Sequence, residues 1–118
     1  MPSKFIRKSL LRPDDADTRV EGFTVDFVTL GGVTFRRFTF EPGFHARPRL
    51  KESMGIEVCP YPHTLVVVSG SGVFKMTDGQ EHAVEPWDVV EMDADHDFWT
   101  TSDDACVMIE PTVETVPS

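Results

Sequence analysis

The sequence contains only two cysteines and no apolar run long enough to cross a membrane. Cys59 and Cys106 lie far apart and do not form a CxxC pair, so a disulfide framework is not expected. The N-terminus carries basic residues but lacks the apolar stretch of a signal peptide. A membrane-spanning helix would need about 20 consecutive apolar residues, and none occurs. We therefore expect a cytoplasmic protein with two free thiols.

Basic residues are also scarce. The 11 Lys and Arg stand against 20 Asp and Glu, which gives a formal net charge of −9 at pH 7. Such a surface repels the phosphate groups of nucleic acids and of anionic lipids. We expect neither a nucleic-acid-binding protein nor a membrane-bound one, and the simplest role of the charge is solubility.

Short apolar segments separated by turn residues dominate the rest of the chain. The length, 118 residues, suits one domain. Phe23, Val25 and Phe27 alternate with polar residues, as in a half-buried strand. Similar segments follow at residues 33–40, 63–69, 73–76, 81–84, 89–92, 97–101 and 106–110. Turn signals recur about every ten residues and leave no room for crossover helices. The pattern predicts an all-β, antiparallel fold, either a barrel or a small open sandwich.

Residues 1–21 are mixed and polar and differ from the rest of the chain. We expect them to form an N-terminal arm, followed by a barrel over residues 22–118. Within that barrel, the apolar phase of the segment 33–40 shifts at Arg36 and Arg37. A β-bulge would explain the shift, as would a strand that is covered on both faces.

Residues 44–62 form the longest stretch without a strand pattern. Proline and glycine interrupt it at Pro48, Gly55, Pro60 and Pro62. These residues predict an irregular loop rather than a helix or a strand. Long ordered loops in small domains are often functional.

Two groups of residues in the segment 41–111 have the spacing of a known pair of motifs. Glu57, Cys59 and His63 precede Gly70 at the spacing H-x-H-x-x-x-E-x-x-x-x-x-x-G, with Glu57 and Cys59 at the two histidines and His63 at the glutamate. This spacing resembles the first motif of the cupin family. The resemblance implies a single-domain jelly-roll β-barrel with a pocket for a small molecule or a metal ion at its mouth.

The second cupin motif, G-x-x-x-x-x-P-x-G-x-x-H, is matched less closely. Trp87 stands at its first glycine and Asp93-Ala94-Asp95 at its P-x-G. Phe98 occupies the position of the final histidine, and His96 lies two residues before it. The chain is also similar to a subgroup of small bacterial cupins. Cupins commonly form homodimers, and the N-terminal arm would suit such an assembly.

Glu57, Cys59 and His63 are residue types that bind metal ions. If residues 57–59 are extended, the carboxylate and the thiol face the same way, and His63 arrives on the next strand. A mixed set of oxygen, sulfur and nitrogen suits zinc best, then nickel, manganese or iron. Alternatively no metal is bound. Cys59 would then be a small buried residue and Glu57 a solvated one, or the groups would act as acid, base or hydrogen-bond partners.

His96 and Tyr61 are the candidate catalytic residues. His96 would complete the metal shell in place of the missing motif histidine, or act as a general acid or base because imidazole titrates near neutrality. Tyr61 lies two residues from Cys59 and so shares its face in an extended chain. Asp97 is poorly placed to orient His96, since adjacent strand residues point to opposite faces. The alternative is a surface histidine.

The candidate ligand pocket combines aromatic and cationic residues. Phe44, Phe98 and Trp99 are predicted wall residues, although ordinary barrel core is the alternative for them. His45, Arg47 and Arg49 follow the 41–43 turn near the expected mouth. The two arginines would recognise a carboxylate unless they are simply solvated.

These residues favour a small-molecule-binding protein. The first interpretation is a metal-dependent isomerase, lyase or dioxygenase-like enzyme acting on a small organic acid or carbonyl compound, in which the ion acts as a Lewis acid. The loss of a three-histidine set argues against ferrous oxygen chemistry. The alternative is a non-catalytic barrel that senses or stores a ligand or a metal. The fold alone does not separate the two, because one fold carries many functions.

Overall fold

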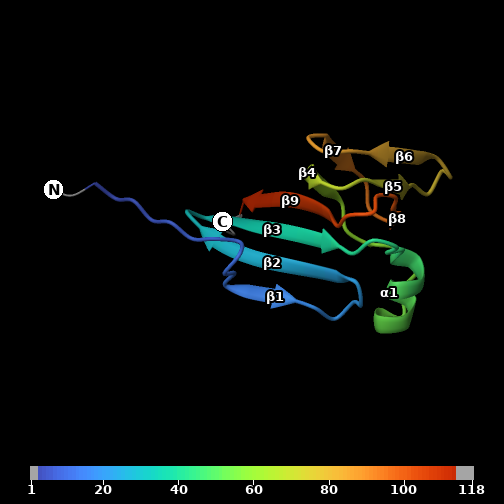
Figure 1. Cartoon of the computed structure of the whole chain (residues 1–118), viewed down its shortest axis with the longest axis horizontal. Helices are drawn as coiled ribbons and strands as arrows, with labels where there is room; N and C mark the ends of the chain where they lie inside the picture. The colour runs from blue at the N-terminus through green and yellow to red at the C-terminus, as the bar shows by residue number, and fades with distance from the viewer. Residues whose placement is uncertain (1–2, 114–118) are drawn as a thin grey trace, which may run out of the picture.

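The computed structural model describes residues 3–113, which form two antiparallel β-sheets and one short helix (Figure 1). The larger sheet has the strand order β1-β2-β3-β9-β4-β7, and the smaller sheet has the order β6-β5-β8. The elements are β1 Asp15–Asp17, β2 Phe23–Leu30, β3 Val33–Phe40, α1 Ala46–Met54, β4 His63–Ser69, β5 Gly72–Lys75, β6 Glu81–Val84, β7 Val89–Met92, β8 Asp97–Thr100 and β9 Cys106–Val113. The all-β antiparallel fold predicted from the sequence is confirmed.

The hairpin of β2 and β3 is regular throughout its length. Its pairing runs without a shift from Phe23 opposite Phe40 to Leu30 opposite Val33. The β-bulge considered at Arg36 and Arg37 is therefore absent. The irregularity in the larger sheet lies on β4, between Val67 and Ser69.

The two arginines of β3 point to opposite faces of the larger sheet. Arg37 forms an ion pair of 2.8 Å with Asp26, a buried carboxylate on the outer face. Arg36 faces inward, together with Phe38. The shift in apolar phase thus results from one charged residue on each face of the strand.

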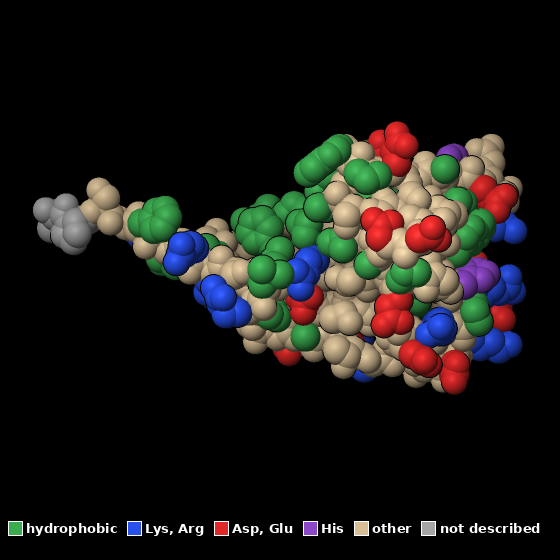
Figure 2. Space-filling view, viewed as in Figure 1, with side chains coloured by type: hydrophobic (Ala, Val, Ile, Leu, Met, Phe, Trp, Pro, Cys, Tyr) green, Lys and Arg blue, Asp and Glu red, His purple; other side chains and the backbone are tan. Residues whose placement is uncertain are grey.

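Part of the predicted N-terminal arm belongs to the larger sheet. β1 pairs with β2, placing Asp15 opposite Phe27. The Asp14 carboxylate accepts a hydrogen bond from the Thr29 amide at 3.0 Å, which holds this edge in place. Residues 3–8 extend away from the body, and hydrophobic side chains gather where this segment leaves it (Figure 2). The β1 segment has no apolar alternation that would have revealed it.

The expectation of an irregular loop over residues 44–62 is wrong in its first half, because α1 lies there. Pro48 is in the first turn of α1, where its missing amide hydrogen is not needed. Gly55 ends the helix with a φ of 72° and donates its amide to the Lys51 carbonyl oxygen at 3.1 Å. Only Ala46 and Leu50 of the helix are buried. Proline and glycine therefore mark the two ends of the helix, rather than breaking it.

The core lies between the two sheets. Val67, Cys106 and Met108 are fully buried there. Gly70 has a φ of 71° and approaches the backbone of Ala105 so closely that a Cβ atom would collide with the carbonyl oxygen. No helix among the described residues is long and apolar enough to cross a membrane.

Candidate metal centre

A cavity of about 440 Å³ lies between the two sheets. Its wall is largely apolar, and the phenylalanine rings that line it are Phe23, Phe27, Phe38, Phe40, Phe44, Phe74 and Phe98. A few polar side chains interrupt this wall, and three of them, Cys59, His63 and His96, lie together. Binding pockets for small molecules have this character, with an apolar wall and few polar groups.

The three side chains come from different parts of the chain. Cys59 precedes β4, His63 begins β4, and His96 precedes β8. Their ligand atoms all lie within 4.8 Å of one another, and Cys59 Sγ is 3.4 Å from His63 Nε2. Two backbone hydrogen bonds join the Cys59 loop to the His96 turn: Cys59 N to the His96 carbonyl oxygen (2.9 Å) and Asp95 N to the Cys59 carbonyl oxygen (2.8 Å). This pairing fixes the thiol next to His96.

Hydrogen bonds to the second nitrogen orient both imidazole rings. His63 Nδ1 lies 2.9 Å from Glu110 Oε1, and the other Glu110 oxygen accepts the Thr64 amide at 2.8 Å. His96 Nδ1 donates to the carbonyl oxygen of Asp93 at 3.0 Å. Because Nδ1 is engaged in each ring, Nε2 is the nitrogen left for a ligand.

These contacts shift the pKa values of the group. Burial works against the Cys59 thiolate, but hydrogen bonds from His63 and His96 outweigh it and lower the pKa of the thiol to about 6. Burial likewise opposes a charged His63, yet its hydrogen bonds to Cys59 and Glu110 raise its pKa to about 9. The hydrogen bond with His63 also lowers the pKa of Glu110 against the effect of burial. Without a metal, the site therefore favours a thiolate beside a protonated His63, and a metal ion that binds His63 Nε2 would displace the proton on that nitrogen.

The environment of the second thiol, Cys106, shifts its pKa in the opposite direction. Cys106 is fully buried on β9, and burial raises its pKa to about 11. Such a thiol stays protonated and packs as a small apolar side chain. The two cysteines thus differ: Cys59 favours the thiolate in the cavity, whereas Cys106 is a protonated residue of the core.

The chemistry of the donors fits a metal ion. One thiolate sulfur and two imidazole nitrogens form a three-residue set suited to zinc, with a fourth coordination position left for a ligand. A metal-bound histidine typically donates its other ring N–H to a carboxylate or a backbone carbonyl. His63 and His96 each make one such contact, to Glu110 and to Asp93 respectively.

No protein-family model matches the sequence, and none of the curated proteins matches it. Solved structures do match in fold. The polyketide cyclase RemF from Streptomyces resistomycificus is 15% identical with a TM-score of 0.66, and the match covers 92% of this chain and 78% of that one. Ectoine synthase from P. lautus is 13% identical with a TM-score of 0.61, over 91% and 76% of the two chains.

A third match is to a cupin-2 domain from Rhodospirillum rubrum. It is 19% identical with a TM-score of 0.56, and the match covers 86% of this chain and 75% of that one. The chain has a cupin fold. At these identities the likeness concerns the fold and not the activity.

In this structure, the residue at the first histidine position of the motif lies outside the cluster. Glu57 is exposed and forms ion pairs with Arg47 at 3.4 Å and with Lys51 at 3.5 Å. The segment before Cys59 is a loop rather than a strand, so Glu57 and Cys59 do not share a face. His96 takes part in the cluster instead, and it is 3% exposed.

Most of the predicted pocket residues lie to one side of β8 or the other, whereas Phe44 borders both the cavity and a second hollow. Phe44 and Phe98 line the cavity. His45, Arg47 and Trp99 line a shallower hollow on the outer side, which we call the outer hollow. Since successive strand residues alternate, His96 and Phe98 face inward while Asp97 and Trp99 face outward.

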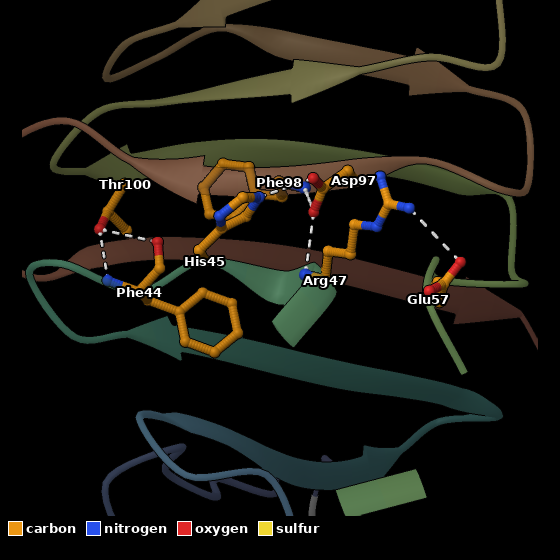
Figure 3. Close-up of polar contacts among 7 residues, drawn as sticks. All are labelled: Phe44, His45, Arg47, Glu57, Asp97, Phe98 and Thr100. Carbon is orange, nitrogen blue, oxygen red and sulfur yellow. Dashed lines mark hydrogen bonds and ion pairs between the residues drawn. The ribbon is translucent and has the colours of Figure 1, made fainter. Parts of the chain in front are cut away.

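Asp97 organises the outer hollow (Figure 3). Its carboxylate lies 2.7 Å from His45 Nε2 and accepts the amides of Arg47 at 3.0 Å and Phe98 at 2.8 Å. Arg47 is in the first turn of α1, so Asp97 joins the start of the helix to β8. Arg47 itself reaches away to Glu57 (Figure 3).

Two other predicted residues lie at the margins of the cavity. Tyr61 lines it but is 65% exposed, and its contact with the cluster is made by its backbone carbonyl oxygen, 4.0 Å from Cys59 Sγ. Arg49 donates to the Glu21 carbonyl oxygen at 2.9 Å and does not line the cavity.

The polar residues of the cavity that the sequence did not predict are Asp17, Arg19, Arg36, Glu110 and Thr112. Glu110 continues the inward-facing series Cys106 and Met108 on β9, so alternation along that strand would have placed it inside. Arg36 lies two residues before Phe38 on β3 and therefore faces inward with it, so alternation along this strand would have placed it in the cavity too.

Proposed function

We propose that this cupin is a metal-dependent enzyme in which Cys59, His63 and His96 hold one divalent ion, zinc, inside the cavity. Its substrate would be a small organic acid or carbonyl compound, and the reaction an isomerisation or a lyase-type step. The observation that carries the proposal is the orientation of the two imidazoles, whose Nδ1 atoms are already bonded to Glu110 and to the Asp93 carbonyl. Their Nε2 atoms remain for the ion, beside the Cys59 sulfur.

The residues of the chain have distinct tasks in such a reaction. Glu110 orients His63 and thereby fixes the position of its Nε2. The aromatic wall excludes water and orients an apolar substrate. A zinc ion at this position would supply Lewis-acid polarisation of a substrate oxygen. Two of the proteins with a similar fold are named as enzymes, a cyclase and a synthase, so catalysis is compatible with this architecture.

The test is the metal content of protein purified without a histidine tag, before and after reconstitution with zinc. We expect about one ion per chain in the wild type, because the cluster offers a single set of three ligands. Cys59→Ala and His63→Ala should remove it. His45→Ala is the matched control, since His45 also contacts a carboxylate but lies in the outer hollow.

Three outcomes would contradict the proposal in whole or in part. A wild-type protein that takes up no metal after reconstitution would leave a metal-free ligand-binding barrel. A protein that binds zinc equally well with and without Cys59 and His63 would place the ion elsewhere. Zinc binding without turnover of any carbonyl compound would favour the non-catalytic alternative, a barrel that senses or stores a ligand or a metal.

A further inference from the structure

Arg36 differs from the other cationic residue that lines the cavity. The cavity has two arginines in its wall, Arg19 and Arg36. Nε and Nη2 of Arg19 donate hydrogen bonds to the Asp17 carboxylate, the shortest of them 2.7 Å. Arg36 forms no ion pair with any residue from 3 to 113; its guanidinium donates one hydrogen bond, of 2.7 Å, to the Thr112 hydroxyl.

The carboxylate nearest to Arg36 in the sheet is already engaged. Glu110 on β9 stands directly opposite Arg36 on β3. Its two oxygens are taken by His63 Nδ1 and the Thr64 amide, and the guanidinium turns toward Thr112 instead. A guanidinium has five N–H donors in a fixed fork, so most of the donors of Arg36 remain available for a ligand.

The surroundings of Arg36 define what would bind to it. Its Cζ atom lies 5.6 Å from the centre of the Phe27 ring, and Phe38 continues the apolar wall along the same strand. A half-buried guanidinium bordered by rings suits a planar carboxylate that it can hold with two parallel hydrogen bonds. Because Glu110 is an anion on the neighbouring strand, a singly charged group is favoured over a doubly charged phosphate.

We propose that Arg36 is the anion-recognition residue of the cavity and that the natural ligand is a carboxylic acid with a planar apolar body. The carboxylate would bind at Arg36, and the body would pack on the phenylalanine rings toward the Cys59–His63–His96 cluster. This inference builds on the proposed function by naming the substrate class. It replaces Arg47 and Arg49, the arginines expected from the sequence to have this role, since neither lines the cavity.

The test is isothermal titration of the whole chain with three probes that share one ring system: 1-naphthoate, 1-naphthamide and 1-naphthyl phosphate. We expect the wild type to bind naphthoate about tenfold or more tightly than the amide, the ratio that one charge-assisted hydrogen-bonded contact supplies. Arg36→Met should abolish that preference, and Arg36→Lys should keep part of it. Arg47→Met is the control and should leave the preference unchanged, and thermal unfolding of each variant checks that it is folded.

Several results would overturn the inference. They are absence of binding, equal affinity for naphthoate and naphthamide, a preference that survives Arg36→Met, or phosphate binding as tight as carboxylate binding. The titrations are run on both chelator-treated and zinc-reconstituted protein, so the two proposals fail separately. A preference for naphthoate in protein that does not bind zinc would contradict the proposed metal site but not the role of Arg36. Zinc binding without a preference for naphthoate over naphthamide would contradict the role of Arg36 but not the metal site.

Discussion

One histidine–carboxylate pair lies inside the cavity, and another lies in the outer hollow. In the first, His63 and Glu110 have side chains that are 14% and 11% exposed, and the free nitrogen of His63 points to Cys59. In the second, His45 is 45% exposed, and its partner Asp97 also accepts two backbone amides. The inner carboxylate orients His63, a candidate metal ligand, whereas the outer one joins α1 to β8.

The difference shows that a histidine beside a carboxylate is not in itself a site. The inner pair is a candidate metal site because two further possible ligands, Cys59 and His96, lie close to the second nitrogen of His63. The outer pair lacks this convergence, although its hydrogen bond is the shorter of the two, 2.7 Å against 2.9 Å.

The largest effect that separates the two faces should be on stability. Phe98 is 3% exposed and packs against other rings of the cavity, whereas its neighbour Trp99 is only partly buried on the outer face. We expect Phe98→Ala to lower the free energy of unfolding by about 3–5 kcal/mol. Trp99→Ala should cost about 1 kcal/mol. Urea unfolding measures both, and equal costs would contradict the assignment of inner and outer faces.

The next effect concerns metal affinity. His96→Ala should weaken zinc binding by about 100-fold or more, because a direct ligand matters more than its hydrogen-bond partner. Competition with a fluorescent zinc indicator measures the affinity. The corresponding change on the outer face, His45→Ala, should leave it unaltered, and an equal loss in both variants would break the distinction between the two pairs.

A smaller loss is expected when only the orientation of His63 is disturbed. Glu110→Gln keeps the size of the side chain but removes the charge that holds His63 Nδ1. Zinc affinity should fall about 10- to 100-fold in the same competition assay. Asp97→Asn changes the outer pair in the same way and serves as the control. Unchanged affinity in Glu110→Gln would show that the carboxylate does not assist the ligand.

The smallest effect is expected for a residue of the outer hollow, and it concerns stability rather than zinc affinity. Asp97→Ala should leave zinc affinity unchanged but lower the free energy of unfolding by about 0.5–1.5 kcal/mol, since the amides of Arg47 and Phe98 lose their side-chain acceptor. Asp103→Ala, at an exposed turn position, is the control and should change stability little. Thermal or urea unfolding separates the variants. A loss of zinc in Asp97→Ala would show that the outer hollow supports the cluster after all.

Local patterns in the sequence were sufficient to predict every strand except β1. Alternating apolar residues and turn signals predicted β2 to β9 because side chains on a strand repeat every two residues. The same reasoning missed α1, because Pro48 and Gly55 are the residues that also break helices, and only their positions at its two ends make them compatible with it. It missed β1 because an exposed edge strand needs no apolar face.

The residue types of the candidate site could also be read from the chain, since Cys59, His63 and His96 are donors whatever their surroundings. Which donors meet was decided by the tertiary structure alone. Periodicity states which face of a strand a residue occupies, but not which strands become neighbours. The pairing of the Cys59 loop with His96 and of β4 with β9 brings His96 and Glu110 to His63, and the same arrangement leaves Glu57 outside with Arg47.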